Sequence, residues 1–148
     1  ARCPAVVRGM SRDCVALALA GARCLPCCVP GDTVDVLIDL GFGVSYHQRV
    51  RLAGIDAPES RTRNLQEKKL GLESKEYLKH RIESCDSIVI RTEKDDTGKF
   101  GRILGWLFLS GDPESINHEM IRLGYAWVYG GGTKGKDLGL LLEKRSAP

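Results

Sequence analysis

Three charged side chains between residues 51 and 59 have the types and spacing needed to act on a phosphodiester bond. Arg51 precedes Asp56 and Glu59, and Pro58 separates the two carboxylates. Hydrolysis of such a bond needs a cation, a group that binds the phosphate and a base for the attacking water. A guanidinium and two neighbouring carboxylates could supply all three functions. A polar turn with a chance cluster of charges would contain the same residues, so this segment alone leaves both interpretations open.

The element that positions these residues is an apolar strand that stops before the proline. Residues 46–53 predict a strand with Val50 and Leu52 on one face and Arg49 and Arg51 on the other. Proline cannot donate a hydrogen bond to a sheet, so a strand that ends this way presents its charged groups at a rigid edge, where active sites are common.

Two further motifs flank this segment. Gly31-Asp32-Thr33 opens a predicted strand that reaches residue 40, and Lys99-Phe100-Gly101-Arg102 precedes another at 103–109. The order GDT, R…DxPE and KxGR resembles that of the staphylococcal nuclease-like (thermonuclease) family. One such motif would be weak evidence, but three in the same order are a strong signal. The resemblance extends from about Gly31 to Gly124.

The resemblance implies an α+β fold, an OB-fold-like five-stranded β-barrel with two to three helices. The chain supplies four clear strands, at 33–40, 46–53, 87–91 and 103–109, and the fifth must come from the first thirty residues. There the prolines at 26 and 30 interrupt the approach to the GDT triplet.

Helical spacing of apolar and small residues predicts the helices. The stripe of the first helix, which should follow the third strand, consists of Leu70, Ser74, Leu78 and Ile82. A shorter helix carries Ile116, Met120 and Leu123 on one face, with Gly124 as its C′ residue. Residues 137–145 could form a third, although Gly139 weakens it.

Metal ligands also follow from the resemblance. It assigns calcium to the carboxylates of Asp32 and Asp56 and to the backbone carbonyl of Ala57, an all-oxygen set of the kind that calcium prefers. Asp32 could instead be a simple turn or cap residue. Pro30 replaces an aspartate that is common in the family, which predicts weaker calcium affinity if that carboxylate supports the site.

The same resemblance assigns the catalytic groups. Glu59 matches the general base, while Arg51 and Arg102 match the arginines that bind the scissile phosphate and stabilise its developing charge. Otherwise Glu59 would be a surface or N-cap-like carboxylate, Arg51 an exposed strand residue, and Arg102 a hairpin residue paired with Asp95 or Asp96.

Nucleotide-binding residues are expected beside these groups. Lys99 and Phe100 match the family's nucleotide pocket, where Phe100 replaces a frequent tyrosine and so keeps stacking but loses a hydroxyl contact. Tyr129 or Trp127 could stack on a base, although aromatic residues after a helix are as often part of the core.

The implied function is that of a calcium-dependent nuclease that cleaves DNA and RNA with little sequence specificity and prefers single strands. We expect the protein to be a monomer and to have no membrane partner. One alternative is a catalytically impaired OB-fold module that only binds single-stranded nucleic acid. Three residues distinguish the enzyme from the binding module: Arg51, Glu59 and Arg102. A relative without catalytic activity should have lost at least one of them. All three are present.

Composition limits these interpretations. A chain of 148 residues fits one domain, and no stretch is long and apolar enough to span a bilayer. The net charge of +3 creates no strong overall field, but basic residues cluster around the central motif. They are Arg49, Arg51, Arg61, Arg63, Lys68 and Lys69.

The first thirty residues depart from the family pattern and would be an atypical arm, a first strand or a leader ahead of a nuclease-like domain at 31–148. Arg8 and Arg12 precede a short apolar run at 15–20, as in a secretory leader, which would favour a secreted or periplasmic protein. A first barrel strand or an irregular arm is equally compatible, and an intracellular relative would look the same from residue 31 onward.

Two motifs outside the nuclease pattern are weaker. Cys24 and Cys27 have the spacing of half a zinc site, which would suit a zinc-stapled interaction domain, but a second half is hard to find. A redox pair is disfavoured because no βαβ pattern surrounds it. The run from Gly130 to Lys136 imitates a phosphate-binding loop, yet Asp137 stands where Ser or Thr is required, so we expect a surface loop.

Overall fold

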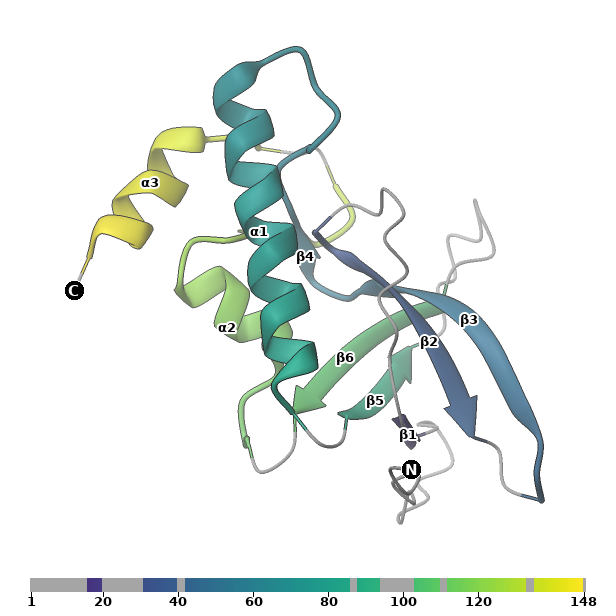
Figure 1. Ribbon diagram of the computed structural model, residues 1–148. Helices are drawn as coiled ribbons and strands as arrows, with labels where there is room; N and C mark the ends of the chain where they lie inside the picture. Colours follow the sequence, from purple (N-terminus) through teal and green to yellow (C-terminus); the bar gives the residue numbers. More distant parts are fainter. Residues whose placement is uncertain are drawn as a thin grey trace.

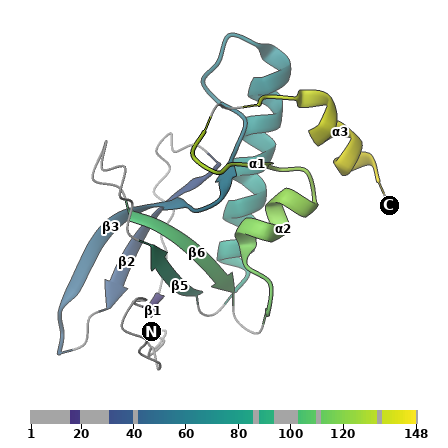
Figure 2. The ribbon, with the colours of Figure 1, turned by 180° about the vertical axis from the view of Figure 1, so that it is seen from behind.

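The computed structural model describes residues 16–19, 31–39, 42–85, 88–93, 103–109, 112–132 and 135–147 (Figure 1). Its strands are β1 (Ala16–Leu19), β2 (Thr33–Asp39), β3 (Ser45–Leu52), β4 (Ile55–Asp56), β5 (Ile88–Glu93), β6 (Ile103–Leu109) and β7 (Trp127–Val128). Its helices are α1 (Leu65–Glu83), α2 (Ile116–Arg122) and α3 (Leu138–Ser146). The helices gather on one side of the molecule, and the β2–β3 hairpin extends away from them (Figures 1 and 2).

Five strands form one mixed sheet in the order β1-β5-β6-β3-β2. β3 and β6 run parallel, while the other neighbours are antiparallel. β4 and β7 form a separate two-stranded sheet. The predicted α+β, OB-fold-like architecture is confirmed, with three helices and with α1 inserted after β3 and β4.

One part of the expected barrel is different. The outer strands of the sheet, β1 and β2, are not paired with each other in the described residues, so the sheet is not a closed barrel. β1 has four residues and pairs along its length with β5. A strand this short offers few further hydrogen bonds with which to close a barrel.

α1 packs its predicted stripe into the core. The side chain of Asn64 caps the helix by accepting hydrogen bonds from the amides of Gln66 and Glu67, at 3.0 and 3.3 Å. The stripe residues Leu70, Ser74, Leu78 and Ile82 are all buried, as their spacing predicted. Leu78 and Ile82 join the sheet residues in one apolar cluster. Burial of such side chains is the main source of fold stability.

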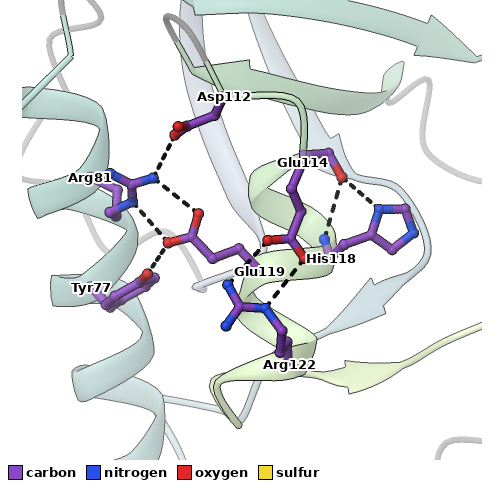
Figure 3. Close-up of polar contacts among 8 residues, drawn as sticks. Tyr77, Arg81, Asp112, Glu114, His118, Glu119 and Arg122 are labelled. Carbon is purple, nitrogen blue, oxygen red and sulfur yellow. Dashed lines mark hydrogen bonds and ion pairs between the residues drawn. The ribbon is translucent and has the colours of Figure 1, made fainter.

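A charged cluster joins α2 to α1 (Figure 3). Glu119 of α2 accepts a hydrogen bond from the Tyr77 hydroxyl and two more from Nε and Nη2 of Arg81, at 2.9 and 3.0 Å. Arg81 also pairs with Asp112 at 2.8 Å. Burial and the carboxylate of Glu119 raise the pKa of Tyr77, so its hydroxyl stays protonated and continues to donate.

The chain then turns back through α3. Gly124 has a φ of 79° directly after α2, which agrees with its predicted C′ position. α3 forms despite Gly139, because Asp137 caps it and Arg145 docks it. Arg145 donates to the carbonyl of Gly124 at 2.9 Å and pairs with Glu73 of α1. None of the helices in the described ranges is long and apolar enough to cross a membrane.

Candidate active site

The site begins where β2 and β3 pair. Thr33 lies opposite Arg51, and the amide of Leu52 donates to the carbonyl of Asp32 at 2.7 Å. This antiparallel register fixes Asp32, at the start of β2, beside the end of β3. Two motifs that are separate in the sequence therefore meet, and backbone hydrogen bonds hold them together.

A tight turn then brings Asp56 back to Arg51. Gly54 has a φ of 74°, and a Cβ atom there would approach the Trp106 ring to 2.9 Å. Glycine is the residue that adopts this backbone conformation without strain. The turn leads into β4, whose first residue, Ile55, accepts a hydrogen bond from Arg51 Nη2 at 3.3 Å.

The result is an arginine between two buried aspartates. Arg51 Nη2 lies 3.4 Å from a carboxylate oxygen of Asp32 and 3.4 Å from one of Asp56. The two oxygens are therefore separated by at most twice that distance. Both aspartates are buried, at 7% and 4% exposure, so neither is a solvated turn residue. Carboxylates taken out of water need a cation or several hydrogen-bond donors nearby, and Arg51 provides one such cation.

The small second sheet adds an aromatic ring. β4 pairs with β7 through Ile55–Val128 and Asp56–Trp127, and the amide of Tyr129 donates to the carbonyl of Gly54 at 2.9 Å. The Tyr129 ring lies 5.3 Å from the guanidinium carbon of Arg51. Of the two aromatic candidates, Tyr129 therefore lies at the site.

Trp127 has a different environment. Its side chain is buried at 6% exposure, and its ring nitrogen donates to the carbonyl of Asp137 at 2.8 Å. A buried indole needs such an acceptor. We therefore place Trp127 in the core, where it ties β7 to the start of α3.

Glu59 lies just beyond the aspartates, half-buried, between Pro58 and the start of α1. Its backbone amide donates to Oε1 of Glu67 at 3.4 Å. α1 comes very close at this point, because a Cβ on Gly71 would lie 2.5 Å from the Pro58 carbonyl and 2.8 Å from Glu59. The helix thus fixes the backbone that carries Glu59. The N-cap of α1 is Asn64, so Glu59 is not the capping residue.

Other predicted residues have mixed outcomes. Ala57 follows β4 and is buried at 3% exposure. Lys99, Phe100 and Arg102 lie outside the described residues, as do Cys24 and Cys27. In the described ranges, no group of three or more His, Cys, Asp or Glu side chains could hold a metal by itself.

The basic cluster divides into two parts. Arg49 forms a two-point ion pair with Asp35, at 2.7 and 2.9 Å, so the Asp35 carboxylate balances its charge within the protein. Around the start of α1, the side chains of Arg61, Arg63, Lys68 and Lys69 are exposed.

Sequence reasoning missed three polar residues that support the site. The side chain of Asn117 is fully buried and bonds to the carbonyls of Ala53 and Gly105 and to the amide of Leu107, at 2.8, 3.0 and 3.1 Å. An asparagine on the apolar face of a predicted helix was the available signal. Glu67 and Lys136 form an ion pair at 2.9 Å beside Glu59, which no sequence pattern indicated.

Fold and site together define a class of domain: an OB-like sheet with an arginine and two aspartates gathered where strands end. Residues 49–144 match the family of staphylococcal nuclease homologues, and the chain belongs to this family. This is a nuclease family, whose members are in general metal-dependent.

The chain is also similar to individual curated proteins, at low sequence identity. The chain is 30% identical to Protein ParB of Escherichia coli over 68% of this chain and 53% of that protein. It is 33% identical to an uncharacterized endonuclease of Escherichia coli, over 67% of this chain and 55% of the relative. An uncharacterized protein of Bacillus anthracis is 30% identical over 66% and 42%. The chain thus spans about half the length of the curated relatives it matches.

Proposed function

We propose that this protein is a calcium-dependent nuclease that hydrolyses phosphodiester bonds in DNA and RNA with little sequence specificity. The observation that carries the proposal is the position of Arg51, 3.4 Å from both Asp32 and Asp56. A buried pair of carboxylates next to a guanidinium can bind a cation and a phosphate side by side.

The donor atoms fit a hard divalent cation. Asp32, Asp56 and the backbone carbonyl of Ala57 would hold it, and all three offer oxygen, the ligand that calcium and magnesium prefer. Three protein oxygens leave room for water and phosphate oxygens in a shell of roughly six to eight ligands. When bound, the ion would polarise the phosphate and offset its negative charge.

The remaining steps belong to side chains of the protein. Glu59 would take the proton of the attacking water, and Arg51 and Arg102 would bind the phosphate oxygens as negative charge develops on them. The planar guanidinium suits this role because it can donate two parallel hydrogen bonds to one phosphate. Glu59 is only half-buried, so part of this residue is open to solvent.

Substrate binding would rely on charge and stacking. The exposed basic residues between Arg61 and Lys69 follow Glu59 directly, and a backbone phosphate next to the site would meet them. Tyr129 would stack on a base, which needs an unpaired strand and discriminates little between sequences. Lys99 and Phe100 would complete the pocket. We propose that a monomer of the domain at 31–148 contains all of these groups.

Degradation of denatured DNA and of RNA in calcium, with and without a chelator, tests the proposal. We expect chelator-sensitive cleavage by the wild-type protein and almost none by the double variant Asp32→Asn, Asp56→Asn. A folded wild-type protein that binds single strands but does not cleave them in calcium, magnesium or manganese would instead establish the binding module.

A further inference from the structure

A lysine far along the chain reaches the segment that carries Glu59. Nζ of Lys136 lies 2.9 Å from Oε1 of Glu67, and the same oxygen accepts the hydrogen bond from the Glu59 amide. Glu67 is buried at 8% exposure, whereas the Lys136 side chain is 38% exposed. One carboxylate oxygen therefore links a lysine of the glycine-rich segment to the backbone of Glu59.

Both ends of this link are anchored independently. On one side, Asn64 caps α1 and fixes the first turn that carries Glu67. On the other, the residue after Lys136 is held twice: the Asp137 carbonyl accepts from Trp127, and its carboxylate caps α3 by accepting from Leu140. A hydrogen bond between two fixed elements can set the position of a third group with little loss of side-chain entropy.

Lys136 and Glu67 favour each other's charged forms. Its pKa is raised above the usual value mainly by the hydrogen bond to Glu67, and the charges of Glu59 and Asp56 raise it further. Burial alone would raise the pKa of Glu67, but the hydrogen bonds from Lys136 and from the Glu59 amide lower it on balance. Both partners of the pair are therefore charged at neutral pH.

We propose that Glu67 and Lys136 are a positioning pair that fixes the backbone of Glu59, and with it the direction of the Glu59 carboxylate. The inference rests on the proposed function in assigning Glu59 the role of base. It extends that function by giving Lys136 a part in the site. Tyr129 contacts Arg51, and Lys136, seven residues further on, contacts Glu67.

Two simpler roles make different predictions. If Lys136 bound a substrate phosphate, its loss would raise KM and weaken the dependence of binding on salt. If the ion pair only stabilised the fold, its loss would lower the unfolding midpoint without changing the Glu59 amide or kcat. A positioning pair affects kcat and the Glu59 amide and leaves KM nearly constant.

The test compares Lys136→Met, Lys136→Arg and Glu67→Gln with Lys79→Met. Lys79 lies on α1 about three turns beyond Glu67 and serves as the matched control for loss of one lysine charge. The first readout is hydrogen exchange of the Glu59 amide, followed by NMR on protein shown to be folded by circular dichroism. The second is kcat and KM on denatured DNA in calcium.

For Lys136→Met and Glu67→Gln we expect Glu59 amide exchange to rise about tenfold and kcat to fall about tenfold, with KM nearly unchanged. Lys136→Arg should restore both readouts, and Lys79→Met should match the wild type. Unchanged Glu59 exchange in Lys136→Met, or a change confined to KM, would overturn the proposal. The exchange readout needs no catalysis, so it tests the pair even if the wild-type protein proves not to be a nuclease.

Discussion

Arg51 contacts both buried aspartates with one terminal nitrogen, and this arrangement has a consequence for metal binding. A divalent cation held by Asp32 and Asp56 would compete with the guanidinium for the same oxygens. Once displaced, Arg51 would be available to a phosphate. The residue that neutralises the carboxylates without metal would thus serve the substrate when the metal is bound.

This competition predicts opposite effects of one substitution. Arg51→Gln should bind calcium at least tenfold more tightly, because a unit positive charge about 4 Å from a divalent ion costs roughly 2 kcal/mol even with the screening of bulk water. The same variant should lose about a hundredfold or more in kcat, because charge on the phosphate is no longer stabilised. Isothermal titration calorimetry and turnover measure the two effects. Weaker calcium binding would show that Arg51 instead holds the carboxylates in place.

Glu59 allows a test of the chemical step alone. Glu59→Gln keeps the size of the side chain but removes the carboxylate that we propose as the base, so kcat should fall about 10²–10⁴-fold while nucleotide affinity changes little. Single-turnover rates and equilibrium binding of a short single strand separate the two quantities. Full activity in the variant would remove Glu59 from the role of base. Its circular dichroism spectrum should match that of the wild type.

At the scale of elements, short connections decide where the site groups lie. β4 and β7 have two residues each, yet their pairing brings Tyr129 to Arg51 and holds Asp56, whose carboxylate lies 3.4 Å from Arg51 Nη2. Such a sheet is marginal by itself. Asn117 of α2 supplies further support by bonding to Ala53, in the turn between β3 and β4, and to Gly105 and Leu107 of β6.

Asn117 should therefore be a strong determinant of stability. Asn117→Ala removes three buried hydrogen bonds, to the carbonyls of Ala53 and Gly105 and to the amide of Leu107, although the Gly105 carbonyl still accepts from the Ala53 amide. We expect this loss to lower the free energy of unfolding by about 3 kcal/mol. Urea denaturation at neutral pH measures this change. Arg122→Ala is the control: Arg122 lies on the same helix as Asn117, and the substitution removes only an exposed ion pair with Glu114, so it should have little effect. An equally small effect of Asn117→Ala would contradict its role as a buried link.

At the scale of the whole molecule, charged pairs should shape stability against pH. Hydrogen bonds from Arg49 lower the pKa of Asp35, and the pKa of Glu67 is also lowered on balance. A depressed carboxyl pKa contributes stability that is present above the usual pKa and is lost as the pH falls through the lowered one. Tyr77 and Lys136 have raised pKa values, so their contributions are lost as the pH rises above their usual values.

We therefore expect the free energy of unfolding to be highest around neutral pH, and to fall below about pH 4 and above about pH 10. Urea denaturation at a series of pH values measures the profile. In Glu67→Gln the acid-side loss should be smaller, because one depressed carboxyl group has been removed. An acid limb identical to that of the wild type would show that Glu67 does not contribute.

The sequence by itself determined much of the local structure. Alternation predicted β2 and β3, and helical spacing predicted the buried face of α1, because these patterns depend on backbone periodicity alone. Three short motifs in order also identified the family and brought Asp32, Arg51 and Asp56 into one hypothesis. Each of these features depends on residues that are close together in the chain or on a short sequence motif.

Only the tertiary structure decided the rest. It showed that Trp127 is core while Tyr129 lies at Arg51, that Asn117 bonds to the carbonyl of Ala53, and that Lys136 pairs with Glu67. It also showed that β1 and β2 leave the sheet open within the described residues. These features depend on contacts between residues far apart in the sequence. No local periodicity encodes such contacts, because they form only when packing brings separate elements together.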